Sequence, residues 1–334
     1  METNYIPGID ISKMKLDAAL TIDGKNYDEF QIENNVAAIK KCLDELKARI
    51  SSLTNLIICI EHTGIYGLPL LDVAVKKGLR ICAEPAKQIK LSQGMVRGKN
   101  DAADARRIAA YAFKNRENLS FWAPQRECIQ TLKALLTTRD RLVKVKIQLE
   151  VPIAEAGEFI SPAIRKEMKK NTRAAVGGIK KDIKRTEQAI RALVKKDTRL
   201  SLQYNLATSV PGVGMMVACN IIIASGEFKR IAEPKKFACY AGVAPFEHSS
   251  GTSVRGKTRV SKMANMNIKK LLHLAAMTAI RYNEELREYY QRKVLLGKNK
   301  MLVINAVRNK LISRIYACIT HQRKYQNNYQ YALA

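Results

Sequence analysis

Four acidic residues in the first third of the chain have the types and surroundings of a metal-dependent catalytic centre. Asp10 lies in an apolar run near the start of the sequence, and Glu61 ends a second apolar run. Asp101 and Asp104 are three residues apart at an expected helix start, so they share one face of that helix. Two strand ends and one helix face would therefore converge on a divalent cation, which prefers hard oxygen ligands.

Clustered carboxylates repel one another, and a divalent cation relieves that repulsion while polarising a phosphate oxygen or activating a hydroxyl. Three of the four acidic residues also have explanations that need no metal. Asp101 caps its helix in one reading, Asp104 pairs with Arg107 in another, and Glu61 simply ends a strand. Asp10 is harder to explain otherwise, since aspartate is depleted in strands. Taken together, the four residues favour a metal site.

A second candidate centre lies in the polar, basic segment 244–264, which we expect to be a loop. Ser249 and Ser250 precede a glycine there. A serine hydroxyl needs activation before it attacks. His248 is a candidate base, but a histidine so close to a serine in sequence rarely has the geometry to take its proton. A metal-bound site elsewhere in the protein is the better candidate for activating the serine. Four cations suited to phosphoryl groups follow: Arg255, Lys257, Arg259 and Lys262.

The charge of the chain predicts a polyanionic partner. The 334 residues carry a formal net charge of +28, with 58 Lys and Arg against 30 Asp and Glu. The first 120 residues contain 18 of the basic and 15 of the acidic residues. Most of the excess positive charge therefore lies after residue 120. Nucleic acid fits best, because many phosphate contacts raise affinity through counterion release. A generally basic protein is the alternative, and an anionic membrane surface fits less well.

Cysteines and apolar runs indicate a cytoplasmic protein. The seven cysteines form no C-x-x-C pair and no metal-finger spacing. We interpret them as reduced core residues. We expect no secretory signal before the first strand, and the longest apolar stretches fall short of a membrane span.

The first 120 residues predict an α/β domain. Alternating apolar residues on both sides of an Asp-Gly turn at 23–24 indicate a hairpin. Asn34 or Asn35 caps the helix that follows. Three antiparallel strands come first, and strands then alternate with helices. The expected strands are 5–11, 15–22, 27–32, 55–60 and 79–83, and the expected helices are 36–50, 68–77 and one beginning at 101.

Residues 121–200 have few glycines and heptad-like apolar spacing, which predicts two long helices in an antiparallel hairpin or coiled coil. Pro152 and Pro162 interrupt the pattern. Packing within the chain and a dimer interface explain the apolar stripe equally well.

The remainder of the chain predicts a helical domain. The sequence Val-Pro-Gly-Val-Gly at 210–214 precedes an apolar run, which is typical of a helix-hairpin-helix. Backbone N–H groups at Gly212 and Gly214 would then hold a phosphate. The alternative is a tight turn between packed helices. Amphipathic helices are expected at 265–283 and 299–319.

These motifs resemble a known family. The acidic quartet, the turn Glu-His-Thr-Gly at 61–64 and the run Lys-Asn-Asp-Ala-Ala-Asp-Ala at 99–105 are similar to those of the DEDD transposases of bacterial insertion sequences, the family that includes the pilin-gene invertase Piv. The segments 209–214, 237–245 and 250–257 resemble the C-terminal domain of the same family. The resemblance extends from about residue 5 to 320, with both motif sets in the right order.

The resemblance implies that the N-terminal domain is RuvC-like and that the quartet binds Mg²⁺, with Mn²⁺ as a substitute. It implies that Ser250 attacks DNA and forms a phosphoserine link, with Ser249 as runner-up because the serine is doubled. It also implies homo-oligomers, a dimer or tetramer, and a structured noncoding bridge RNA that pairs with donor and target DNA. The family's Lys-Arg-Gly-Asn stretch reads Lys-Met-Ala-Asn at 262–265, which removes an arginine from the expected nucleic-acid contacts.

The sequence therefore predicts an α/β, RNase H-like domain, a long helical coiled-coil middle and a mainly α-helical C-terminal domain with a helix-hairpin-helix. The hypothesis is an RNA-guided DNA recombinase. Two competitors remain: a metal-only endonuclease resembling junction resolvases, and a nucleic-acid-binding protein without catalysis. The expected domain boundaries are 1–120, 121–200, 201–325 and a tail at 326–334.

Overall fold

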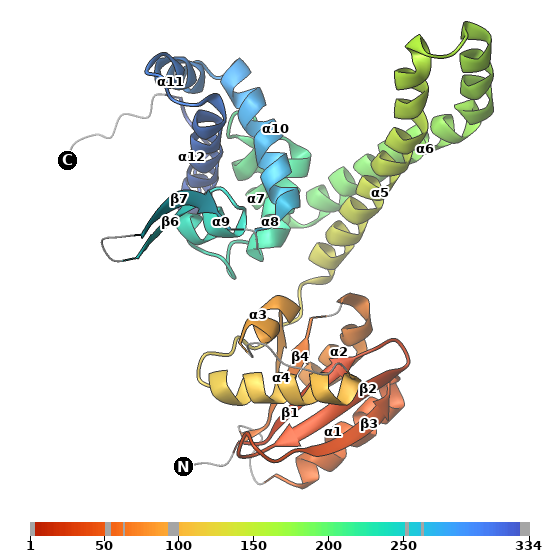
Figure 1. Cartoon of the computed structure of the whole chain (residues 1–334), viewed down its shortest axis with the longest axis vertical. Coiled ribbons are helices and arrows are strands. Elements are labelled where there is room, and N and C mark those ends of the chain that lie inside the picture. Colours follow the sequence, from red (N-terminus) through yellow and green to blue (C-terminus); the bar gives the residue numbers. More distant parts are fainter. Residues whose placement is uncertain are drawn as a thin grey trace. The chain divides into compact units, whose positions relative to one another are not determined.

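Two units make up the chain in the computed structural model, Met1–Pro124 and Gln125–Ala334 (Figure 1). The helices expected at 121–200 fall in the second unit together with the C-terminal helices. The structure describes residues 4–50, 55–62, 64–92, 100–250, 254–261 and 264–327, without the side chains of residues 158, 247–250 and 254–259.

A five-stranded mixed sheet forms the first unit, in the order β3-β2-β1-β4-β5. The first three strands are antiparallel, and the last two run parallel to β1. This is the arrangement that the sequence predicts for the N-terminal domain. The strands are β1 (Ile6–Ile11), β2 (Lys15–Thr21), β3 (Asp28–Glu33), β4 (Ile57–Glu61) and β5 (Arg80–Glu84).

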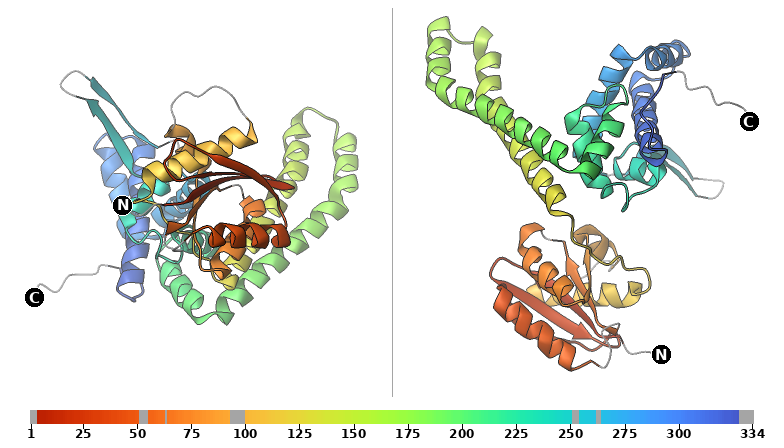
Figure 2. Two further views of the ribbon diagram at one scale, coloured as in Figure 1. Left: turned by 90° about the horizontal axis from the view of Figure 1, so that it is seen from below. Right: turned by 180° about the vertical axis from the view of Figure 1, so that it is seen from behind.

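Helices cover both faces of this sheet, and two separate apolar clusters lie between them and the strands. In Figure 2, left, the sheet lies between α4 and α1. Asn35, one of the two expected residues, caps α1 by accepting a hydrogen bond from the Ala38 N–H. A short 3-10 helix, Gly64–Gly67, replaces part of the expected loop after β4. The other helices of the unit are α1 (Val36–Ala48), α2 (Leu68–Lys76), α3 (Ala86–Leu91) and α4 (Asp101–Asn115).

Helix α4 approaches β1 closely because the contact is made by small residues. A Cβ placed on Gly8 would lie 2.1 Å from the Ala109 nitrogen and 2.6 Å from the Ala105 carbonyl oxygen. Both alanines are fully buried. Gly8 therefore sets the distance between the helix and the strand that carries Asp10.

Two long antiparallel helices begin the second unit (Figure 2, right). They are α5 (Glu127–Glu155) and α6 (Pro162–Lys196). Helix α5 continues through Pro152, so the predicted interruption there was wrong; Pro162 does begin α6. Buried residues near the base of this hairpin, such as Leu132 and Ile190, pack with Ile222 of the C-terminal helices. Packing within the unit thus accounts for part of the apolar stripe.

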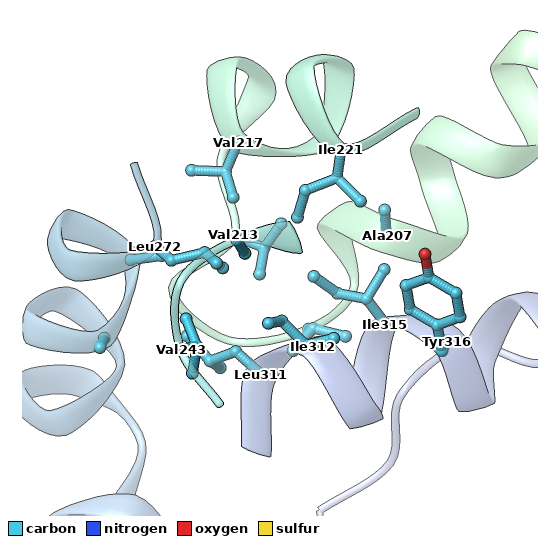
Figure 3. Close-up of a cluster of buried hydrophobic side chains, with 14 of the residues drawn as sticks. Ala207, Val213, Val217, Ile221, Val243, Leu272, Leu311, Ile312, Ile315 and Tyr316 are labelled. Carbon is cyan, nitrogen blue, oxygen red and sulfur yellow. The ribbon is translucent and has the colours of Figure 1, made fainter. Parts of the chain in front are cut away.

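Six helices and a hairpin complete the described part of this unit. Their largest apolar cluster includes Val213, Leu272 and Ile315 (Figure 3). No helix in the described ranges is long and apolar enough to cross a membrane. The elements are α7 (Thr198–Thr208), α8 (Met215–Ser225), α9 (Pro234–Tyr240), β6 (Pro245–Ser250), β7 (Val254–Val260), α10 (Met266–Tyr282), α11 (Glu284–Leu295) and α12 (Lys300–Thr320).

The turn between α7 and α8 contains Gly212 at φ +85°, a conformation that favours glycine. A Cβ at this position would lie 2.4 Å from the Ala275 carbonyl oxygen of α10. The tight turn between packed helices, one of the two readings of this motif, is therefore present. A phosphate contact at Gly212 or Gly214 stays a prediction.

The expectation of a loop over 244–264 was wrong, because β6 and β7 pair there as an antiparallel hairpin. Val254, Thr258 and Val260 are β-branched and favour a strand. The glycines and charged residues between them hide that pattern in the sequence. The hairpin extends away from the neighbouring helices (Figure 1).

Replacing Gly8 with alanine is expected to destabilise the protein by about 3 kcal/mol, because the new methyl group meets helix backbone that cannot move aside easily. Equilibrium unfolding in urea measures the change. Gly177→Ala is the control: a Cβ there meets nothing within 4 Å, and alanine should stabilise α6 by about 0.5–1 kcal/mol. Equal stability of Gly8→Ala and wild type would contradict the close approach.

Candidate active site

One row of polar residues crosses the whole sheet of the first unit. The antiparallel registers pair Gln31 with Asp17 and Asp17 with Asp10, and the parallel register pairs Glu61 with Glu84. The register of β1 and β4, continued by one residue, places Asp10 beside Glu61. Residues that are direct neighbours across a sheet point to the same face. Four carboxylates therefore share one row, and two of them, Asp17 and Glu84, were not predicted as site residues.

The row lies on the face that α4 covers, because Asp10 follows the helix-contacting Gly8 by two positions. Asp101 and Asp104 occupy the first turn of this helix. Asn100 caps the helix by accepting a hydrogen bond from the Ala103 N–H at 2.7 Å, so the reading of Asp101 as the cap was wrong.

Burial and like charge raise the pKa values of Asp10 and Glu61. Burial raises the pKa of Asp10, and the charges of Asp104, Asp101 and Asp17 add to the rise. Burial likewise raises the pKa of Glu61, with further contributions from Asp10 and Asp104. Asp10 thus lies within electrostatic reach of the other three predicted residues, and Glu61 within reach of Asp10 and Asp104. A site that repels its own charges favours cation binding.

Two basic side chains already contact the carboxylates of α4. Lys15 Nζ lies 3.1 Å from Asp101 Oδ2 and 3.2 Å from Asp17 Oδ2. Its hydrogen bonds to these two carboxylates raise the pKa of Lys15. Arg107 Nη1 lies 2.5 Å from Asp104 Oδ1, so the ion pair expected for Asp104 is present.

The donor set suits Mg²⁺ or Mn²⁺ in its chemistry, because every candidate ligand is a carboxylate oxygen. The side chains are not gathered around one point. Within the described ranges, no group of three or more His, Cys, Asp or Glu side chains is placed to hold a metal ion. Asp101 instead contacts Lys15, and Asp104 contacts Arg107.

Glu84 ends the row at β5 and is 9% exposed. Tyr111 donates a hydrogen bond to its carboxylate at 3.4 Å. Burial raises the pKa of Glu84, and this hydrogen bond opposes the rise. The nearby His62 Nδ1 accepts a hydrogen bond from the Gly64 N–H at 3.5 Å. His62 therefore makes a contact within its own turn.

The predicted nucleophile lies in the second unit. Ser250 is the last residue of β6 and pairs with Val254, while Ser249 pairs with Arg255. The side chains of these serines, and those of Arg255, Lys257 and Arg259, are outside the described structure, as is the whole of Lys262. Their roles stay predictions.

A polar contact anchors the residues that lead into this hairpin. Asn305 Nδ2 donates to the Val243 carbonyl at 2.7 Å. Arg308, 5% exposed, donates to Asn305 Oδ1 at 3.3 Å and lies 2.6 Å from His273 Nδ1. The sequence gives no signal for this set, because its members come from α10 and α12.

Asp10→Asn is expected to raise the thermal stability of the metal-free protein at neutral pH. The folded state raises the pKa of Asp10, so the cost of its charge is absent at low pH and grows as pH rises past the unfolded value. Asparagine removes that charge. Calorimetry in a chelator should show a midpoint higher by roughly 2–4 °C at neutral pH and unchanged near pH 3.

Asp72→Asn is the matched control, because Asp72 is exposed and pairs with Lys76 at 2.7 Å. It should bring no gain at either pH. An Asp10→Asn protein no more stable than wild type at neutral pH would show that the carboxylate carries no electrostatic strain.

Comparison with known proteins gives two family matches along the chain. Residues 7–155 match a transposase family model, DEDD_Tnp_IS110, and residues 204–291 match the model of the transposase IS116/IS110/IS902 family. The two matches lie one after the other and include the acidic quartet and Ser250.

Two relatives align with this chain over nearly their whole length. The pilin gene-inverting proteins of Moraxella bovis and Moraxella lacunata are each 25% identical over 333 residues, spanning 97% of this chain and 98% of the relative. A 43.6 kDa protein of insertion element IS110 from Streptomyces coelicolor is 28% identical over 120 residues, covering 36% of this chain and 29% of that protein.

Solved structures of RuvC from Thermus thermophilus also match. The complex with a Holliday junction substrate has a TM-score of 0.28 at 16% identity, covering 36% of this chain and 99% of that one. The two consecutive family matches and the full-length relatives identify the chain as a DEDD transposase or recombinase of the IS110 and Piv type, an enzyme acting on DNA.

Proposed function

We propose that this enzyme is an RNA-guided recombinase of an insertion sequence that cuts and rejoins DNA through a phosphoserine at Ser250. Mg²⁺, or Mn²⁺ in its place, is held by Asp10, Glu61, Asp101 and Asp104. The observation that carries the proposal is the carboxylate row beneath the first turn of α4, where burial and like charge favour a divalent cation.

A bound divalent cation would polarise a phosphate oxygen and stabilise charge that develops on the scissile phosphate. The protein supplies the frame. Asp10 and Glu61 are fixed by neighbouring strands, and α4 brings Asp101 and Asp104 over them. Gly8 and the alanines of α4 set the distance between the helix and the sheet. The ligands are therefore carried by rigid elements, which favours precise positioning.

The serine step conserves the energy of the phosphodiester. The Ser250 oxygen attacks phosphorus and loses its proton, and the bond from phosphorus to one sugar oxygen breaks. That oxygen leaves as a strand end and takes up a proton. In the reverse direction, the hydroxyl of a second strand end attacks the phosphoserine, releases the serine and rejoins the DNA.

Donor and target DNA and a structured RNA are the proposed partners. The excess of basic residues after residue 120 supports phosphate binding. Arg255, Lys257 and Arg259 alternate along β7 next to the serines, and Lys262 follows. Gly212 and Gly214 at the α7–α8 turn are further phosphate contacts in this proposal. Base pairing by the RNA would then select the DNA sequence, as in other guided systems.

The chain acts as a homo-oligomer, a dimer or tetramer, in this proposal. The family resemblance supports it, because it pairs the metal-binding domain with the serine domain across subunits. The relatives from Moraxella are named for inverting a gene, so inversion and insertion are both outcomes compatible with the same cutting and rejoining steps.

Ser250→Ala is expected to abolish a covalent protein–DNA adduct while leaving DNA binding within about twofold, since a single serine hydroxyl adds little affinity. Wild type, Ser250→Ala and the control Ser249→Ala are incubated with element-end DNA, element-derived RNA and Mg²⁺, and resolved on a denaturing gel. The adduct peptide should map to residues 249–257. Asp10→Asn should lose both adduct and cleavage.

Each alternative predicts a different gel. Cleaved DNA without any adduct would replace the recombinase proposal with a metal-only endonuclease. Binding without cleavage under conditions in which a close relative cleaves its own DNA would indicate a non-catalytic binding protein. An adduct that survives in Ser250→Ala and vanishes in Ser249→Ala would move the nucleophile by one residue.

A further inference from the structure

Lys15 has a fixed backbone position at the edge of the acidic row. It begins β2 directly after the turn from β1. Ser12 holds that turn: its hydroxyl donates to the Lys15 carbonyl at 2.8 Å and accepts from the Lys15 N–H at 3.2 Å. Asn34 Nδ2 also donates to the Ser12 carbonyl at 2.8 Å. The lysine stem therefore starts from a rigid point.

The two carboxylates that contact Lys15 have unequal surroundings. The Asp17 side chain is 12% exposed and also accepts a hydrogen bond from Gln31 Nε2 at 2.7 Å. The Asp101 side chain is 55% exposed. Ion pairs in solvent are weak and readily exchanged, whereas a desolvated, hydrogen-bonded partner is retained. Asp17 is the firm partner of Lys15, and Asp101 is the exchangeable one.

Both carboxylates of α4 are engaged by basic side chains. Lys15 engages Asp101, and Arg107 engages Asp104. In the described part of the chain, three or more metal-ligating side chains do not gather at one point. A divalent cation entering the row therefore competes with a lysine for Asp101.

We propose that Lys15 is a positioning residue that holds Asp101 in the metal-free enzyme and releases it to the incoming metal, remaining on Asp17. The inference rests on the proposed metal-binding function. Lys15 offsets the repulsion of the carboxylates while the site is empty of metal. It then moves from a shared position to a single buried partner, which leaves Asp101 free to act as a ligand.

Titration of the full chain with Mn²⁺ in a calorimeter tests this exchange without relying on activity. Lys15→Met keeps the stem and removes the competing charge, so it should bind Mn²⁺ about three- to fivefold more tightly, the upper part of the range for losing one weak ion pair. Lys15→Arg should stay close to wild type. Lys15→Gln is a second neutral variant should the methionine variant fold poorly.

Lys13→Met is the matched control. Lys13 is exposed, lies two residues away and makes no ion pair with the residues that the structure describes. The variant loses the same charge, so a change within about twofold would report only the long-range field. The exchange would be overturned if Lys15→Met and Lys15→Gln bound Mn²⁺ with the same affinity as this control, or more weakly than wild type. Absence of Mn²⁺ binding in wild type as well as the variants would instead overturn the metal function itself.

Discussion

Repulsion between carboxylates is the constraint around which the first unit is built. Asp10, Asp17, Glu61 and Glu84 share one row on a sheet face that a helix covers. Removing such charges from water is unfavourable without partners. Lys15 offsets part of this cost at Asp17, and Lys15 and Arg107 pair with the carboxylates of α4. Stability of the unit and affinity for a divalent cation are therefore linked, because both depend on how the row is neutralised.

Much of this site could be predicted from sequence, because its main signal is local. Aspartate in an apolar strand is unusual, and that rule identified Asp10. The same rule applies to Asp17 in β2. Lys15 and Glu84 join the site only through strand register, and register depends on pairing between distant segments, which the sequence does not display. The approach of α4 depends on Gly8 meeting Ala105 and Ala109, a packing relation invisible in either segment alone.

In the second unit, the sequence predicted the long helices but not the strand hairpin. The long helices were evident from apolar spacing. Helix α5 nevertheless continues past Pro152 to Glu155, although proline removes a helix hydrogen bond. The hairpin of β6 and β7 was expected to be a loop, since glycine and charged residues interrupt its β-branched positions. Its pairing is set by backbone contacts between the two strands rather than by a composition that favours strands.

The most direct test of the account is a crystal of the full chain grown with Mn²⁺, examined by anomalous scattering. The account predicts one strong peak in the acidic row, within about 2.5 Å of oxygens from Asp10 and at least one α4 carboxylate. Lys15 would then contact Asp17 alone. A fully occupied Mn²⁺ elsewhere on the protein, with the row unchanged and Lys15 still on Asp101, would contradict it.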